Sequence, residues 1–213
     1  MIIQKIVKKD DRNVIVHLDN SEKLFLSKEV ILKNSLRKGD LLSEEKANQL
    51  IKENQSFFIR QKAFTLLGRR PHSRYEIKIK LKQKKYDNDL IDNLLDELES
   101  KNYLNDNEFA LAFARDKQKF KHFGSFRIRN ELLKKRVSRE IIDQTLAEIF
   151  SEGNDVDEAV YHLNKKIKNR TNIDLNENGV TNKLLAFLIR KGFDFETAKL
   201  AIENVKREIS QNS

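Results

Sequence analysis

Residues 69–86 read RRPHSRYEIKIKLKQKKY, and eight of these eighteen residues are Lys or Arg. The alternation of apolar and basic side chains in EIKIKLK is typical of a half-buried strand. The flanking residues predict a helix instead. Ser73 and Glu76 have the spacing of a capping box, and Pro71 lies just upstream, where helices seldom extend. The local sequence alone is compatible with both structures.

An internal repeat favours the helix. Three segments share an apolar i, i+4 pair, a turn with a large apolar residue, and a second amphipathic run. The matching positions are Ile77, Leu81, Tyr86, Leu90, Ile91 and Leu95; Ile128, Leu132, Val137, Ile141, Ile142 and Leu146; and Leu184, Leu188, Phe193, Thr197, Ala198 and Ile202. The equivalents of IKIKL are IRNEL and LLAFL, which do not alternate. We therefore predict a helix over Ser73–Lys85.

Another helix is expected before each segment, in FFIRQKAFTLL, EFALAFARDKQKF and DEAVYHLNKKIKN, so the unit is three helices repeated three times. The N-terminal runs IIQKIV, NVIVHL and KLFL predict three short strands, and Ser43 is the expected N-cap of the helix that follows them. The predicted fold is mainly α, an elongated array of three tandem three-helix repeats preceded by a small β-rich segment. The expected boundaries are residues 1–45 for that segment and 46–104, 105–150 and 151–213 for the repeats.

Composition limits the class of protein. The 213 residues are 35% charged and include one Pro, six Gly and no Cys, which favours a helix-rich protein without disulfides or thiol chemistry. The apolar N-terminal run is too short for a signal peptide, and no apolar run approaches the roughly 18 residues of a membrane span. We expect a cytoplasmic monomer that does not contact membranes.

The positive charge is concentrated in the middle of the chain. The net charge is +9, and residues 57–150 alone carry 21 basic and 14 acidic side chains. Such a concentration is typical of a protein that binds a polyanion, nucleic acid first, although a role in solubility alone stays open.

The basic residues also recur between repeats. On the predicted helix, Arg74, Lys78, Lys82 and Lys85 fall within about an 80° arc at 100° per residue. Residue 78 corresponds to Arg129, and Lys84 to Lys135 and Lys191. Stacked repeats would align these side chains as a basic track that suits a phosphate backbone. The predicted track comprises Arg70, Arg74, Lys78, Lys82, Lys84, Lys85, Arg115, Lys119, Lys121, Arg127, Arg129, Lys134, Lys135, Arg136, Arg190 and Lys191.

No pattern of catalytic residues emerges. The four His show no metal-ligand spacing, and His72 beside Pro71 is expected to be an exposed turn residue. Asp92, Asp96 and Glu99 have the spacing of a solvent-facing helix surface, which leaves a metal-dependent nuclease as a minor alternative. Glycine loops of the nucleotide-binding type are missing from the sequence. We predict no enzyme, no metal site and no cofactor.

The sequence AFTLLGRRPHSRYEIKIKLKQKKY, followed by LIDNLLDELESKNYLNDNEFALAFARDK and GSFRIRNELLKKRVSREIIDQTL, resembles the RecX regulatory proteins of bacteria. The resemblance covers residues 57–150 well and the third repeat more loosely. The family tends to have Gly after the Lys-rich helix end, whereas only Gly192 fits here, and Lys85 and Arg136 take the other two positions. Asn102 also stands where Gly is common, and Asn is the next best residue at a left-handed helix end.

The resemblance implies a modulator of the RecA recombinase. Its expected partners are the RecA filament and single-stranded DNA, with double-stranded DNA also to be considered, and its expected effect is to block ATP hydrolysis and strand exchange. The alternative function is a stand-alone DNA-binding protein, for example a transcriptional regulator. The helix pairs within each repeat and the basic middle segment are compatible with it.

Overall fold

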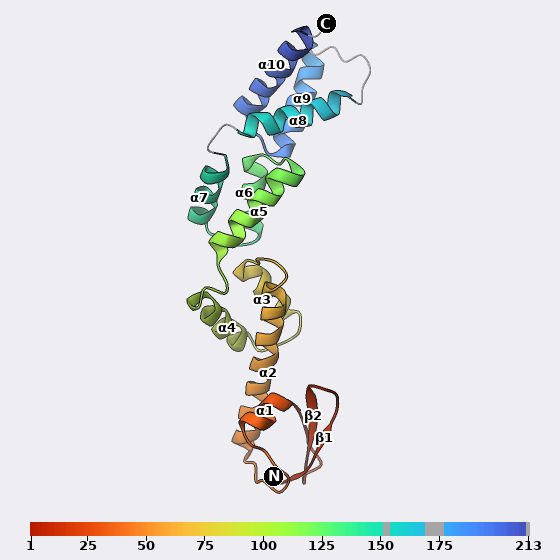
Figure 1. Ribbon diagram of the computed structural model, residues 1–213, viewed down its shortest axis with the longest axis vertical. Helices are drawn as coiled ribbons and strands as arrows, with labels where there is room; N and C mark the ends of the chain where they lie inside the picture. Colours follow the sequence, from red (N-terminus) through yellow and green to blue (C-terminus); the bar gives the residue numbers. More distant parts are fainter. Residues whose placement is uncertain (151–153, 169–176, 212–213) are drawn as a thin grey trace. The chain divides into compact units, whose positions relative to one another are not determined.

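The computed structural model describes residues 1–150, 154–168 and 177–211 (Figure 1). The described residues form one three-stranded sheet followed by helices: β1 Ile3–Lys8, β2 Asn13–Leu18, β3 Lys23–Ser27, α1 Lys28–Lys33, α2 Glu44–Leu67, α3 Arg74–Lys82, α4 Asn88–Ser100, α5 Asp106–Lys121, α6 Ser125–Lys134, α7 Arg139–Ile149, α8 Asn154–Lys168, α9 Asn178–Lys191 and α10 Phe195–Gln211. The chain divides into two compact units, residues 1–70 with 76–104, and residues 71–75 with 105–213.

The three strands form an antiparallel meander in the order β1-β2-β3. Alternate residues of β2, namely Val14, Val16 and Leu18, are buried, and Val14 pairs with Leu26 of β3. Because a small sheet is not stable alone, this face needs a cover. The strands share one apolar core with Val30 of α1 and the first part of α2. The predicted N-terminal β structure is confirmed.

Helix α2 is longer than the sequence suggested. The sequence predicts one helix after Ser43 and a separate one over residues 57–67, but the structure has a single helix of 24 residues (Figure 1). Ser43 caps it as predicted, since its side chain accepts a hydrogen bond from the backbone N–H of Lys46 at 3.1 Å. Its first half packs on the strands and its second half on α4, so one helix serves both cores of this unit.

The stretch with alternating charge is a helix, as the repeat comparison predicts. Helix α3 begins at Arg74, directly after Ser73, with Ile77 and Leu81 fully buried. It ends at Lys82 rather than at Lys85, because residues 83–85 form a turn and Lys85 has a φ of 59°. The predicted arc of four basic side chains therefore loses Lys85, which lies beyond the helix.

Each three-helix repeat has a core of its own. One core is formed by residues of α2, α3 and α4, the next by α5, α6 and α7, and the last by α8, α9 and α10. The apolar positions that revealed the repeat are buried or half-buried in these cores. The mainly α fold of three-helix repeats after a small sheet is confirmed.

The turn after the second helix of each repeat has the same backbone conformation. Lys85, Arg136 and Gly192 occupy equivalent positions, with φ values of 59°, 58° and 99°. Asn102, after α4, also has a positive φ of 56°. Three of these four left-handed positions therefore carry Lys, Arg or Asn, at the places where the sequence resemblance leads us to expect glycine.

Candidate nucleic-acid interface

Two cations of the predicted track in the first repeat are engaged by carboxylates. Arg70 forms an ion pair with Glu76 at 3.0 Å, and Lys78 of α3 pairs with Asp92 of α4 at 2.6 Å. Asp92 was one of the carboxylates considered for a metal-dependent nuclease. The structure instead uses it to connect two helices of one repeat.

The same ion pair recurs in the second repeat. Arg129 of α6 pairs with Asp143 of α7, and the two residues are the repeat equivalents of Lys78 and Asp92. In the third repeat the equivalent positions are Leu185 and Lys199, so the pair is not repeated there. The ion pair between two helices of one repeat therefore accounts for the basic residue at positions 78 and 129.

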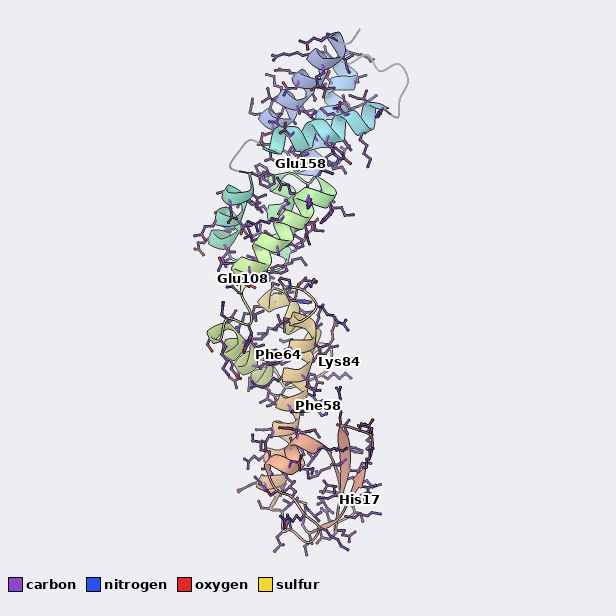
Figure 2. All side chains as sticks on the ribbon, in the orientation of Figure 1. His17, Phe58, Phe64, Lys84, Glu108 and Glu158 are labelled. Carbon is purple, nitrogen blue, oxygen red and sulfur yellow. The ribbon has the colours of Figure 1, made fainter. Side chains whose placement is uncertain are left out.

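The basic residues at the end of α3 are different. Lys82, Lys84 and Lys85 are exposed and make no ion pair with any described residue. Lys84, labelled in Figure 2, lies in the turn that follows the helix. These three ammonium groups are available to an external anion.

The turn after α6 presents the equivalent cations of the second repeat. Lys134 and Arg136 are exposed, and the Arg136 guanidinium lies 6.0 Å from the ring of Tyr75. The Lys135 ammonium lies over the rings of Phe113 and Phe109, at 5.1 and 5.8 Å. Aromatic rings therefore contact the basic side chains of this turn.

A short segment before α3 holds this turn in place. The Ser73 hydroxyl donates a hydrogen bond to the backbone carbonyl of Lys135 at 3.1 Å. The backbone N–H of Arg74 donates to Asp106 Oδ1 at 2.8 Å, and the Arg74 side chain is half-buried. Ser73 was predicted to act in a capping box with Glu76. The reciprocal hydrogen bonds of that box stay a prediction.

Helix α5 carries several basic side chains of the predicted track, and part of their charge is neutralised by an ion pair. Arg115 pairs with Glu148 at 2.7 Å, whereas Lys119 and Lys121 are exposed. Of the two Phe residues that interrupt this basic run, Phe123 is buried in the core of the second repeat and Phe120 is 66% exposed. Only Phe120 has a ring face that is accessible for stacking.

The second and third repeats meet at a contact between backbones. The N–H of Gly124, before α6, donates to the carbonyl of Lys191 at 3.1 Å, and Phe126 N–H donates to the carbonyl of Gly192 at 3.0 Å. The contact brings the predicted track residues Arg127, Arg190 and Lys191 together, and Arg127 Nη1 donates to the Arg190 carbonyl at 3.4 Å.

Two basic residues near this contact, Lys165 and Lys166 of α8, were missed from the sequence. Lys166 and Lys191 share a contact with the ring of Phe187, at 4.1 and 5.6 Å. Burial lowers the pKa of Lys191, and the charges of Lys165 and Lys166 add to this effect. Their signal was the pair KK in DEAVYHLNKKIKN, which has no equivalent in the other repeats.

Of the four histidines, His72 and His162 are buried and His122 contacts a carboxylate. His72 is 3% exposed, so the expectation of an exposed turn residue is wrong. His162 is also buried, and burial lowers its pKa to about 4. His122 Nδ1 lies 2.5 Å from the carboxylate of Glu158, which Figure 2 labels on α8. No group of three or more His, Asp or Glu suited to a metal occurs among the described residues.

Within the same residues, no helix is both long and apolar enough to cross a membrane.

Comparison with known proteins supports one family. The family model described as "RecX, first three-helix domain" matches residues 60–98, and "RecX, second three-helix domain" matches residues 105–146. Regulatory protein RecX of Clostridium botulinum (strain Alaska E43 / Type E3) is 29% identical over 195 residues, which cover 92% of this chain and 91% of that protein. Regulatory protein RecX of Streptococcus sanguinis is 27% identical over 213 residues, covering all of this chain and 80% of that protein.

Solved structures share the fold. A crystal structure of regulatory protein RecX has a TM-score of 0.69 and 20% identity, and the match covers 95% of this chain and 98% of that one. The structure of RecX from Lactobacillus salivarius has a TM-score of 0.62 and 18% identity over 72% of this chain. The repeat domains, the full-length relatives and the shared fold agree: this chain belongs to the RecX family of regulatory proteins.

Proposed function

We propose that this chain binds the RecA filament on single-stranded DNA and slows its ATP hydrolysis and strand exchange. The observation that carries the proposal is a set of basic side chains at equivalent helix ends of the three repeats. These side chains have no ion-pair partner among the described residues: Lys84, Lys85, Lys134, Arg136, Arg190 and Lys191. Membership of the RecX family supplies the regulatory role with RecA.

Unpaired cations suit this role for a physical reason. A charge that lacks an internal partner keeps its full attraction for an external phosphate, and each neutralised phosphate releases counterions. A cation already held by a carboxylate, such as Lys78 or Arg129, has less to gain. We therefore assign the binding role to the helix ends and a structural share to the ion-paired positions of the predicted track.

Regulation of this kind requires no chemistry by the chain itself. A protein that occupies the filament slows RecA by binding alone. We propose that it acts in the cytoplasm as a monomer, on RecA and on the DNA that RecA covers.

The test is the rate of ATP hydrolysis by RecA filaments of the same organism on single-stranded DNA, measured with increasing amounts of this chain. The rate should fall and reach a plateau near one bound chain per binding site on the filament. An unchanged rate at saturating amounts would rule out the proposal.

A stand-alone DNA-binding protein is the second candidate, favoured by the cations that surround Lys191. It predicts tight binding to one duplex sequence in the absence of RecA. Equal affinity for unrelated duplexes, combined with an effect on RecA filaments, would exclude a sequence-specific transcriptional regulator.

A further inference from the structure

Four cations converge where the second and third repeats meet, and we call them the seam cluster: Arg127, Lys165, Lys166 and Lys191. The half-buried Lys191 lies at their centre. Its pKa is lowered first by burial and then by the charges of the other three residues. Like charges repel, so this arrangement destabilises the free protein unless an anion joins it.

The protein supplies little negative charge to the seam cluster. Among the described residues, Glu131 is the carboxylate that reaches it, 3.7 Å from Arg127 Nε, and Glu131 is shared with Lys117 at 3.1 Å. Three acids of the third repeat lie near this contact, and none forms an ion pair with the seam cluster. Asp155 accepts hydrogen bonds from Ser125, and burial raises its pKa to about 6. Glu158 pairs with His122, and Asp194 accepts hydrogen bonds from Thr197.

The backbone at the seam is tightly fixed. A Cβ added to Gly192 would lie 2.3 Å from Arg127 Cβ, and one added to Gly124 would lie 2.4 Å from the Gly192 carbonyl oxygen. The backbone N–H groups of Gly124 and Phe126 already donate to the carbonyls of Lys191 and Gly192. Those amides are unavailable to a ligand, so side chains must form the site.

Aromatic rings orient the cations. The ammonium groups of Lys166 and Lys191 lie 4.1 and 5.6 Å from the ring of Phe187, and the Arg127 guanidinium lies 3.8 Å from the ring of Phe123. Such contacts hold long basic side chains without neutralising them. Phe126, next to Arg127, is 53% exposed.

We propose that the seam cluster is a binding site for consecutive phosphates of single-stranded nucleic acid. Several cations around one lysine match a backbone that carries one charge per nucleotide. The exposed ring of Phe126 favours a nucleic acid over an acidic peptide, because bases of a single strand stack on aromatic side chains. The inference rests on the proposed function, and it specifies which residues meet the DNA.

The experiment measures binding of a fluorescent oligo(dT) strand to the full chain over a series of salt concentrations, without RecA. The variant K166Q/K191Q removes two cations. The matched control K183Q/K199Q removes two exposed lysines of α9 and α10 outside the cluster. For single strands, each lost phosphate contact makes the slope of log K against log salt shallower by about 0.7. The seam variant should therefore lose about 1.4 in slope, and the control should lose little.

The variant K166R/K191R keeps the charge and should restore the slope, which separates loss of contacts from loss of fold. Circular dichroism checks the fold of every variant. A slope equal to that of the wild type in K166Q/K191Q would overturn the proposal. So would normal oligonucleotide binding with a lost effect on RecA filaments, because the cations would then contact protein. Oligonucleotide binding that depends on the seam, with no effect of the wild type on RecA, would support the site and refute the proposed function.

Discussion

Lys85 and Arg136 occupy equivalent turns in a backbone conformation that suits glycine. Lys85 and Arg136 have φ values near +60°, at the position that Gly192 takes in the third repeat. This conformation destabilises an L-residue by roughly 1–2 kcal/mol and costs Gly almost nothing. Both residues belong to the helix ends to which we assign binding. We infer that the cost is kept because it places a basic side chain at the turn.

Replacing these residues by glycine should separate stability from binding. Lys85→Gly and Arg136→Gly should each raise the free energy of unfolding by about 0.5–1 kcal/mol while weakening binding to DNA or filament. Lys134→Gly is the control, because residue 134 is helical and Gly there should destabilise by about 0.5–1 kcal/mol. Urea denaturation measures the free energy of unfolding of the two variants and of the control. A loss of stability in Lys85→Gly and Arg136→Gly would contradict the inference.

The half-buried Asp155 and the buried His162 have pKa values shifted in opposite directions. Burial raises the pKa of Asp155 to about 6, although its carboxylate accepts hydrogen bonds from Ser125. Burial lowers the pKa of His162 to about 4, although a ring nitrogen lies 2.7 Å from the His122 carbonyl. Both groups belong to the unit that contains the seam.

The two shifts predict opposite effects of pH on stability. Between pH 4 and 6, Asp155 holds a proton in the folded chain that it releases in the unfolded chain. Its contribution to the free energy of unfolding therefore falls as pH rises. His162 loses a proton on folding between pH 4 and 6.5. Its contribution to the free energy of unfolding therefore falls as pH falls. Each contribution amounts to at most about 3 kcal/mol. Relative to the wild type, Asp155→Asn should therefore gain stability from pH 4 to 6.5, and His162→Gln should lose it.

Urea denaturation at several pH values in this range tests the prediction, with the exposed Asp157→Asn as the control. Parallel pH profiles for the wild type, Asp155→Asn and His162→Gln would show that the two groups are not shifted on folding.

At the scale of elements, periodicity predicted most of the structure. Helix α3 could be identified because its alternating pattern is missing from the two equivalent segments, and buried Ile77 and Leu81 fit the helical spacing. The strands and the Ser43 cap were predictable because they depend on residues close in sequence.

Long-range contacts were not predictable. The polar run NQS at residues 54–56 looks like a break between two helices, yet Asn54 hydrogen-bonds to the backbone of Phe25 and Ser27 on β3. That contact lets α2 continue past the sheet. Likewise, the ion pairs of Lys78 and Arg129 depend on how two helices pack, and residue counts along one helix do not reveal them.

The contact between the second and third repeats predicts a sensitive glycine. Gly192→Ala combines a left-handed φ of 99° with a clash against Arg127, so it should cost about 3 kcal/mol or more. Gly39→Ala is the matched control. Residue 39 has a similar φ of 94°, but an added Cβ would meet no atom within 4 Å, so the expected cost is about 1–2 kcal/mol. Equal losses in urea denaturation would mean that the seam is loosely packed.

At the scale of the whole molecule, ion pairs divide the basic residues into two groups. Charges such as Arg70, Lys78, Arg115 and Arg129 are matched by carboxylates of the same chain. The helix-end cations Lys84, Lys85, Lys134, Arg136, Arg190 and Lys191 have no ion-pair partner among the described residues, and each repeat supplies two of them. On the function proposed above, the unpaired part of the net charge of +9 serves a polyanion outside the chain.

The most direct measurement compares the wild type with the variant K84Q/K85Q/K134Q/R136Q in ATP hydrolysis by RecA filaments on single-stranded DNA. The control Lys78→Gln/Arg129→Gln removes two cations that are ion-paired. We predict that the wild type and the control slow hydrolysis at similar concentrations, and that the helix-end variant requires much more protein. An unchanged hydrolysis rate with the wild type, or equal potency of the wild type and the helix-end variant, would contradict regulation through the unpaired cations.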